Sequence, residues 1–308
     1  MQREAATARN DDVLMPFVFE HANVRGALVS LDATSRDILV SHDYPPPLAR
    51  ALAELLAAAV LLASSLKLDG SLIVQLSGDG PVRLIVVECN DALQVRATAQ
   101  WDAGRVRELG DDASLAELAG GSTHGRLALT LDPRNAGTLY QGIVSLDSTS
   151  IAASIEHYLA TSEQLQSRLW LLPDAGNVRG LLLQRLPGSD ALDDATWARL
   201  ARDADAVSRR ALDAATLTDI LRTMFAHDDL RLFDVRPVTF RCKCSVARVA
   251  NALRIAGRDE IEAALAERGV VEVTCEFCNR RYSFTADDAR ALLAGAAPDA
   301  STRTGVVR

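Results

Sequence analysis

Basic residues are too few in this sequence for a general nucleic-acid-binding protein. The 308 residues carry 33 Lys and Arg against 41 Asp and Glu, a net charge of −8, and only two of the bases are lysine. Basic side chains that neutralise phosphates supply most of the non-specific affinity for nucleic acid, so a net acidic chain lacks that driving force. With 48% hydrophobic and 24% charged residues, the composition is that of a globular protein of two domains, or of one domain with a sizeable appendage.

Two kinds of apolar segment are also missing. The first twelve residues, MQREAATARNDD, contain no apolar stretch of the kind that forms a secretory signal. The most apolar run, 48–66, is interrupted by Arg50 and Glu54 and is rich in alanine. It is also short for a bilayer span, which needs about 20 apolar residues. We therefore expect a buried helix at 48–66, and a cytoplasmic protein with reduced thiols and no membrane partner.

The signatures of common enzyme classes are absent as well. The sequence has no GxSxG motif, no P-loop and no dinucleotide-binding fingerprint. A polar loop at 120–125 contains Ser122 and His124, but their closeness in sequence does not indicate a catalytic triad. We therefore predict that the protein is not an enzyme and has no catalytic residues.

The informative residues are four cysteines near the end of the chain. Cys242 and Cys244 form one pair, and Cys275 and Cys278 form a second pair thirty residues further on. In a reducing compartment, paired cysteines at short spacing indicate a metal site before they indicate structural disulfides. Four thiolates complete the tetrahedral coordination of zinc and leave no open position for a substrate, so one structural Zn²⁺ per chain is predicted. Cys89 lies apart from them and is expected to be a small buried hydrophobe.

The pattern of short apolar runs predicts an α+β core domain over residues 1–187. Hairpins outnumber βαβ units in this pattern, so its sheets are expected to be largely antiparallel. Helices are expected from about 45 to 67 and from 150 to 166. Strands are expected at 16–20, 24–32, 71–76, 82–89, 93–101, 125–132, 138–147, 167–173 and 178–187.

Residues 188–240 differ in character, and we predict that they form a helical linker. Two apolar stripes follow helical spacing, a strong one at 217–225 and a weaker one around 197–207. The other face of the weaker stripe carries many charges, so its docking is expected to be marginal and its order to depend on its neighbours. For 217–225, the alternative to a helix whose order depends on its neighbours is an ordinary packed helix. Both interpretations can hold, each in its own redox state. The stripe residues are Trp197, Leu200, Ala204, Val207, Leu217, Ile220, Leu221, Met224 and Phe225.

Residues 241–295 are predicted to form a compact zinc-binding domain, followed by a flexible tail at 296–308. Helices are expected at about 246–256 and 258–268, strands on both sides of the second cysteine pair, and a last helix capped by Thr285. A domain of this size buries little apolar surface, whereas structural zinc contributes about 10–16 kcal/mol of apparent folding free energy. Removal of the metal is therefore expected to unfold the domain.

Oxidation offers a way to remove the metal. Sulfurs around a tetrahedral zinc lie about 3.8 Å apart, against about 2.05 Å in a disulfide, so coordination and disulfide bonding exclude each other. Each pair can close on its own neighbour, Cys242 with Cys244 and Cys275 with Cys278, in loops too short to replace the metal as a tertiary crosslink. A structural zinc knob that merely holds these residues together is the alternative.

A zinc-ribbon nucleic-acid-binding module is a further alternative. Arg280 and Arg281 lie beside three aromatic residues, Phe277, Tyr282 and Phe284. Against this alternative, residues 241–308 carry 11 basic and 9 acidic side chains, a net charge of only +2, and the rest of the chain is acidic. The aromatic residues also fit the small core of the tail better.

The chain resembles the heat-shock 33 kDa redox-regulated chaperone family, also called 33 kDa chaperonin, along almost its whole length. The resemblance rests on the two cysteine pairs with their spacing and on segments spread through the first domain. These segments are HDYPPPLARALAELLAAA at 42–59, GDGPVRLIVVE at 78–88, YQGIV at 140–144, SEQLQSRLW at 162–170 and GLLLQRLP at 180–187. The four cysteines match the family's zinc-binding and disulfide-forming residues one for one. Asn279 stands where the family pattern has glycine, and asparagine tolerates a left-handed backbone nearly as well.

The resemblance implies an ATP-independent holdase of the bacterial cytosol. The protein would be inactive when reduced and zinc-bound, and activated by oxidants combined with unfolding stress. When the tail unfolds, the helices at 190–232 would lose their neighbour and expose apolar surface, which binds unfolding client proteins. A homodimer is expected in the activated form, with no nucleic-acid partner.

Overall fold

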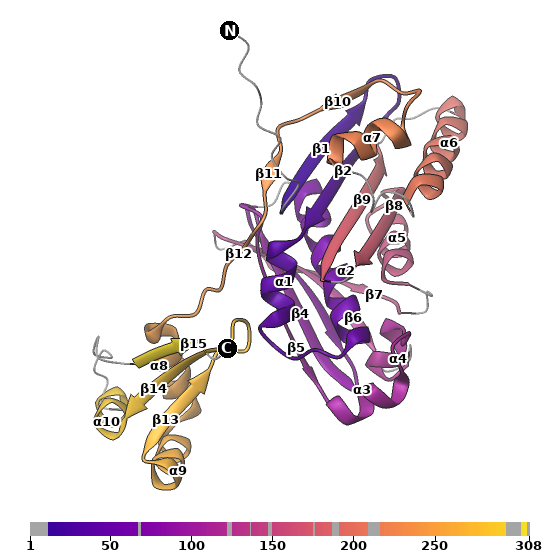
Figure 1. The fold of residues 1–308 in the computed structure, drawn as a ribbon. Helices are drawn as coiled ribbons and strands as arrows, with labels where there is room; N and C mark the ends of the chain where they lie inside the picture. Colours follow the sequence, from indigo (N-terminus) through magenta and orange to yellow (C-terminus); the bar gives the residue numbers. More distant parts are fainter. Residues whose placement is uncertain are drawn as a thin grey trace. The chain divides into compact units, whose positions relative to one another are not determined.

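The computed structural model describes residues 12–66, 69–121, 125–135, 137–146, 150–174, 176–186, 191–208, 216–293 and 303–306. The chain divides into two units, Met1–Phe240 and Arg241–Arg308 (Figure 1), and each has its own hydrophobic core. The sequence-based prediction of an α+β chain with antiparallel sheets and a cysteine-bearing C-terminal part is confirmed.

The first sheet of the N-terminal unit has the strand order β10-β1-β2-β9-β8, and β11 also pairs with β1. All of these pairs are antiparallel. The four long strands lie where the sequence predicts them, whereas the short strands β10 and β11 come from the segment predicted to be a helical linker. The bounds are β1 Val13–Phe19, β2 Val24–Leu31, β8 Ser167–Asp174, β9 Asn177–Arg185, β10 Leu230–Leu232 and β11 Arg236–Pro237.

The second sheet has the strand order β12-β5-β4-β3-β6-β7. Both predicted hairpins are confirmed, because β3 pairs with β4 and β6 pairs with β7, each antiparallel. The edge strand β12 pairs with β5 in parallel and again comes from the predicted linker. The bounds are β3 Gly70–Ser77, β4 Val82–Asn90, β5 Gln94–Trp101, β6 Arg126–Pro133, β7 Tyr140–Val144 and β12 Thr239–Phe240.

Helix α2, Pro46–Ser65, packs against strands of both sheets and is the centre of the N-terminal core (Figure 1). Prolines at its first two positions suit a helix start, because the missing N–H groups would have no partner inside the helix. Among the described residues it is the one helix long and apolar enough to cross a bilayer, but 72% of its apolar window is buried inside the fold. The prediction of a buried helix here is confirmed.

The sequence does not predict the short helices α1 Ala33–Val40, α3 Ala103–Leu109 and α4 Leu115–Ala119 of this unit. Their five to eight residues are too few to show a clear 3.6-residue period. For α4, a signal was present, because Ser114 and Glu117 form a reciprocal capping box. The predicted helix at 150–166 is shorter than expected and forms α5, Ile151–Thr161.

Within the predicted linker, the described residues 191–208 and 216–240 form two helices, α6 Ala191–Ser208 and α7 Leu217–Met224. The stripe predicted from Leu217 to Phe225 is confirmed, since its five apolar side chains are at most 5% exposed. They and the apolar side chains of α6 pack on one face of the first sheet, against β1, β2, β8 and β9. The strand residues of this docking face are Met15, Phe17, Phe19, Val24, Leu28, Trp170, Leu181 and Leu183, and the helical ones are Trp197, Leu200, Ala204, Leu217, Ile220, Leu221, Met224 and Phe225.

The neighbour that covers the linker stripe is therefore the N-terminal sheet, which corrects the expectation that the tail is that neighbour. The charges of α6 also take part in the docking. The Nε1–H of Trp170 in β8 donates to Asp205 Oδ1 at 2.7 Å, and Arg185 in β9 pairs with Asp194. Arg199 pairs with Asp228, beyond α7, at 2.5 Å. The charged side chains of α6, from which a marginal docking was expected, thus form hydrogen bonds and ion pairs in the structure.

The described part of the C-terminal unit, 241–293 and 303–306, forms three helices and one small sheet of strand order β13-β14-β15. Its predicted helices and strands are confirmed, and Thr285 caps α10 by accepting the N–H of Asp288 at 3.2 Å. Within the predicted flexible tail, residues Arg303–Val306 form β15, which pairs with β14. The bounds are α8 Val246–Ala256, α9 Arg258–Arg268, β13 Val270–Thr274, β14 Arg280–Thr285, α10 Ala286–Leu293 and β15 Arg303–Val306.

Candidate metal centre

The four predicted cysteines come together in the C-terminal unit, with all four Sγ atoms within 4.8 Å of one another. Cys242 and Cys244 lie between β12 and α8, and Cys275 and Cys278 lie in the turn between β13 and β14. The Sγ atoms of Cys242 and Cys275 are 3.6 Å apart, and those of Cys244 and Cys278 are 3.4 Å apart. All four side chains are half-buried thiols without a disulfide.

The β13–β14 turn is shaped to present two sulfurs on the same side. The N–H of Cys275 donates to the carbonyl of Arg280 at 2.9 Å, and the N–H of Asn279 donates back to the carbonyl of Cys275 at 2.8 Å. Asn279 has φ of 54°, in the left-handed region that asparagine tolerates better than most residues. The expectation that asparagine can replace glycine after the last cysteine is therefore confirmed.

Hydrogen bonds to the sulfurs stabilise negative charge at the cluster. The thiol of Cys242 donates to Cys275, and the N–H groups of Phe277 and Cys278 also point at this sulfur, which lowers the pKa of Cys275 to about 4. Donation to Cys275 in turn raises the pKa of Cys242. Burial raises the pKa of Cys278 to about 11, and the N–H of Arg280 opposes that rise. The cluster is thus built to share protons or to exchange them for a cation.

Tyr282 adds a donor that the sequence analysis did not assign. Its hydroxyl donates to Cys244 Sγ at 3.1 Å, while its ring is only 1% exposed and belongs to the core of the unit. The expectation that Phe277, Tyr282 and Phe284 belong to that core is confirmed for Tyr282 and Phe284, which is fully buried. It is wrong for Phe277, which lies in the turn between the two cysteines of its pair and is only half-buried. The rings of Tyr282 and Phe284 are therefore not available to stack on nucleic-acid bases, and the zinc-ribbon alternative loses two of its three aromatic residues.

The donor set fits a tetrahedral zinc site. The sulfur separations of 3.4 and 3.6 Å are close to the value of about 3.8 Å around zinc and far from the disulfide length of about 2.05 Å. Among the described residues, no histidine or carboxylate joins the four sulfurs in this cluster. A soft, closed set of four thiolates is typical of structural zinc, and it leaves no position for a substrate.

The remaining candidate residues lie elsewhere. Cys89 is in β4, is fully buried, and has a pKa raised to about 12 by burial, so the prediction of a small buried hydrophobe is confirmed. Ser122 and His124, on which an enzymatic alternative depended, lie outside the described residues.

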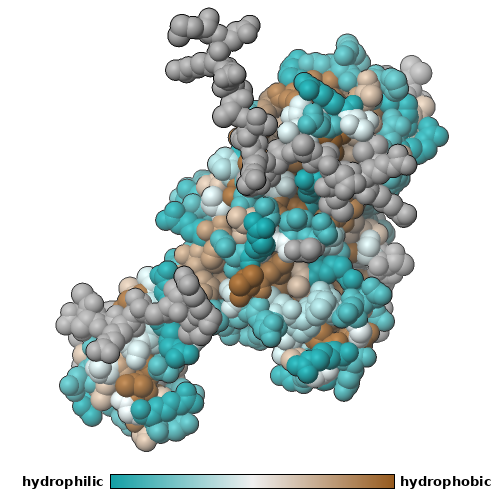
Figure 2. Space-filling view, viewed as in Figure 1, coloured by the Kyte–Doolittle hydropathy of each residue, from teal (hydrophilic) through white to brown (hydrophobic). Residues whose placement is uncertain are grey.

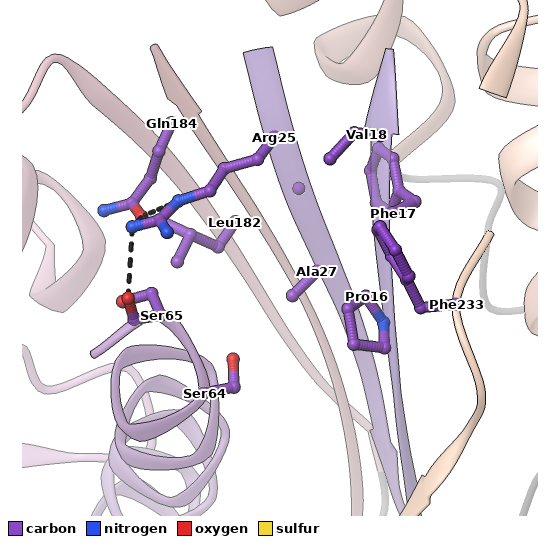
Figure 3. A pocket seen from close by; sticks show the side chains of 11 residues that line it. Pro16, Phe17, Val18, Arg25, Ala27, Ser64, Ser65, Leu182, Gln184 and Phe233 are labelled. Carbon is purple, nitrogen blue, oxygen red and sulfur yellow. Dashed lines mark hydrogen bonds between the residues drawn. The ribbon is translucent and has the colours of Figure 1, made fainter. Parts of the chain in front are cut away.

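A cavity of about 150 Å³ in the N-terminal unit lies beside Phe233, which follows β10 (Figure 3). Arg25 points along one wall, where it donates to Gln184 Oε1 at 2.8 Å and to the carbonyl of Ser65 at 3.1 Å. Burial lowers the pKa of Arg25. The N–H of Phe233 donates to the carbonyl of Pro16 in β1 at 3.0 Å. The hydroxyls of Ser64 and Ser65 donate to carbonyls of their own helix, and the lining of this cavity contains no nucleophile paired with a base.

Comparison with known proteins identifies relatives over nearly the whole chain. The family profile of the Hsp33 protein matches residues 12–285. The 33 kDa chaperonin of Pseudomonas fluorescens is 40% identical over 298 residues, which cover 95% of this chain and 97% of that protein. The 33 kDa chaperonin of Azotobacter vinelandii is 42% identical over 299 residues, or 95% of this chain and 98% of that protein.

A solved structure has the same fold. The crystal structure of the 33 kDa chaperonin from Thermotoga maritima matches with a TM-score of 0.76 and 22% identity, covering 92% of this chain and 98% of that one. The antiparallel sheets and the cluster of four cysteines agree with the family match and the near full-length relatives. The chain therefore belongs to the Hsp33 family of chaperones.

Proposed function

We propose that this chaperone is a redox-regulated holdase that binds unfolding client proteins without ATP and prevents their aggregation. The observation that carries the proposal is the cluster of four half-buried sulfurs, Cys242, Cys244, Cys275 and Cys278, within 4.8 Å of one another. Its ligand would be one Zn²⁺ per chain in the reduced form. The same cluster would be the sensor, because thiolates are the form of cysteine that peroxide oxidises.

The reduced state would be inactive because the docking face of the first sheet is covered by α6 and α7. The side chains of α6 and α7 that pack on the first sheet are at most 8% exposed. The surface visible in Figure 2 is mostly hydrophilic, and its hydrophobic residues form separate patches. Clients with exposed apolar segments bind contiguous apolar surface. The docking face would become such a surface only when α6 and α7 leave the first sheet.

Bound zinc would crosslink two chain segments that are thirty residues apart and keep their four sulfurs deprotonated. Oxidation by hydrogen peroxide joins two thiolates in a disulfide. The sulfurs give up two electrons, and the peroxide takes up those electrons and two protons to form two molecules of water. A disulfide-bonded pair has no thiolate left for the metal, so the C-terminal unit would lose the crosslink and unfold.

The proposed disulfides are Cys242–Cys244 and Cys275–Cys278. The sulfur contacts of 3.6 and 3.4 Å in the folded cluster run across the pairs, from Cys242 to Cys275 and from Cys244 to Cys278. Pairing of neighbours is proposed for the unfolding unit, because the closure of a long loop costs more chain entropy once the fold no longer holds the two pairs together. Mass spectrometry of unreduced peptides distinguishes the two pairings.

Unfolding of the C-terminal unit would reach the linker through the chain itself. Strand β12 ends at Phe240, two residues before Cys242, and β10, β11 and β12 have only two or three residues each. Short edge strands are held by few hydrogen bonds, so a loose C-terminal end would fray them first. Helices α7 and α6 would then leave the docking face and expose it.

The further parts of the proposal follow from membership of a chaperone family. Partners would be unfolded or unfolding client proteins, and the activated form would be a homodimer. Nucleic acid and membranes would not be partners. The protein would work in the cytoplasm, where a reducing poise keeps the cysteines as thiols until oxidative stress.

The experiment is a light-scattering assay of the aggregation of an unfolding client, without ATP. We expect little suppression by the reduced, zinc-bound protein and strong suppression after peroxide treatment at raised temperature. Treatment with a thiol reductant and zinc should reverse the effect. Cys89→Ala is the control and should behave like the wild type. Equal suppression by the reduced protein at low temperature would contradict the proposal.

A further inference from the structure

We propose that Tyr282 is a positioning residue of the metal centre, whose hydroxyl holds Cys244 and slows the reaction of the cluster with oxidants. The inference rests on the proposed zinc site and adds to it a residue outside the four ligands. It concerns how easily the switch operates, since a donor to a thiolate withdraws electron density from the atom that attacks peroxide.

The contact is built by the fold and does not depend on a flexible side chain. The Tyr282 hydroxyl lies 3.1 Å from Cys244 Sγ, which is within hydrogen-bond range for sulfur. The tyrosine lies in β14 opposite Val273 of β13, and only 1% of its surface is exposed. Because close packing fixes the ring, the hydroxyl is delivered to the sulfur by the apolar core of the unit. The core thus reaches the metal centre through this hydroxyl as well as through the packing of Cys244 and Cys275 against it.

A second group strengthens this donor. The guanidinium of Arg280, two residues earlier in β14, donates to the Tyr282 hydroxyl oxygen. A hydroxyl that accepts from a cation is a better donor, so the chain from Arg280 through Tyr282 to Cys244 polarises in one direction. Arg280 itself is exposed, and solvent weakens its part.

The hydrogen bond to Cys244 can be removed by a side-chain substitution, whereas a hydrogen bond from a backbone N–H group cannot. The donors to Cys275 are the thiols of Cys242 and Cys278 and the backbone N–H groups of Phe277 and Cys278. Backbone N–H groups also donate to Cys242 and Cys278. At Cys244, the donor from outside the four cysteines is the Tyr282 hydroxyl, beside the thiols of Cys242 and Cys278, which lose their protons when a metal binds. Tyr282→Phe removes this O–H and keeps the buried ring, so the core of the unit stays packed.

The expected effects of Tyr282→Phe follow from the lost hydrogen bond. Loss of an outer partner of a metal ligand commonly lowers metal affinity about 10- to 100-fold, and we expect the lower end here. Peroxide should oxidise the zinc-bound protein several-fold faster, as followed by zinc transfer to a chromogenic chelator. In the Co²⁺-substituted protein, the sulfur-to-metal charge-transfer band should move to lower energy, because one thiolate has lost its donor. Arg280→Gln should shift the rate and band in the same direction by less.

Two control variants separate positioning from a merely structural role. Val271→Ala loosens the same small core and leaves the hydroxyl in place, so it should not move the charge-transfer band. Tyr158→Phe removes a tyrosine hydroxyl that donates to Glu163 at 2.7 Å in the other unit, and should change none of the readouts. The inference is overturned if Tyr282→Phe matches the wild type in rate and spectrum. If the wild type binds no zinc at all, the proposed function fails instead.

Discussion

The two units of this protein differ in what keeps them folded. The N-terminal unit buries a large cluster of apolar side chains from both sheets and α2, whereas the described residues of the C-terminal unit form a core of nine buried side chains. Because the fraction of surface buried on folding rises with size, we expect the small unit to need a metal crosslink that the large unit does not need. The four cysteines lie in the small unit, and the buried Cys89 lies in the large one. We therefore expect oxidation of the cysteines to unfold the C-terminal unit and to leave the N-terminal unit intact.

The largest effect should come from breaking the metal centre. Cys275→Ser removes one ligand and should lower zinc affinity by several orders of magnitude, because structural zinc contributes about 10–16 kcal/mol of apparent folding free energy. Hydrogen exchange should then rise throughout 241–293 while the N-terminal unit stays protected. The matched control Cys89→Ala should retain one zinc per chain. Full zinc content and unchanged protection of 241–293 in Cys275→Ser would contradict the view that the metal keeps the C-terminal unit folded.

A smaller effect is expected where the linker docks on the large unit. Leu221 is 1% exposed in the docking face, so Leu221→Ala should cost about 2–5 kcal/mol of docking and folding free energy. Hydrogen exchange of α6 and α7 should rise in the reduced protein, and part of the anti-aggregation activity should be present without oxidant. Arg222→Ala, on the exposed face of α7, is the control and should change neither. Unchanged exchange in Leu221→Ala would mean that this face does not hold the linker.

The two units should also respond to pH in opposite ways. Burial raises the pKa of Glu54 in α2 from 4.5 to about 7, against the opposing charge of Arg50. The folded N-terminal unit therefore holds a proton more tightly than the unfolded chain does. This contribution is fully present below pH 4.5 and is lost as the pH rises to 7, at a cost of about 3 kcal/mol. The metal centre should instead weaken in acid, because its ligands must be deprotonated.

Glu54→Gln tests the first half of this contrast. The variant should raise the unfolding free energy of the N-terminal unit by about 3 kcal/mol at pH 8 and by little at pH 4.5. Denaturant unfolding at both pH values measures this difference. The exposed Glu108→Gln is the control and should show no such dependence on pH. A stabilisation that is equal at both pH values would show that Glu54 is not protonated on folding.

The smallest effect should come from local structure in the C-terminal unit. The Thr285 hydroxyl accepts the N–H of Asp288 in the first turn of α10, so Thr285→Ala should cost about 1 kcal/mol. With zinc bound, the unit should stay folded and unfold at a slightly lower temperature. Thr274→Ala, at the exposed end of β13, is the control. If Thr285→Ala alone unfolds the zinc-loaded unit, zinc is not the main contributor to the folding free energy of the C-terminal unit.

Features written in short sequence patterns could be predicted, and features that depend on distant residues could not. The hairpins, α2, the apolar stripe of α7 and the two cysteine pairs each have a local signal of spacing or turn residues. Strands β10, β11 and β12 have two or three residues, too few for any period, and they form only because the edges of two sheets are open to them. The contact of Tyr282 with Cys244 joins positions 38 residues apart and depends on the register of β14.

Time-resolved hydrogen exchange after peroxide treatment at raised temperature tests the central claim most directly. We expect protection to be lost first in 241–293, together with zinc, and later in 191–232, as suppression of client aggregation begins. The strands of the N-terminal unit should remain protected throughout. Opening of the linker while zinc is still bound, or loss of protection in both units at once, would contradict the account.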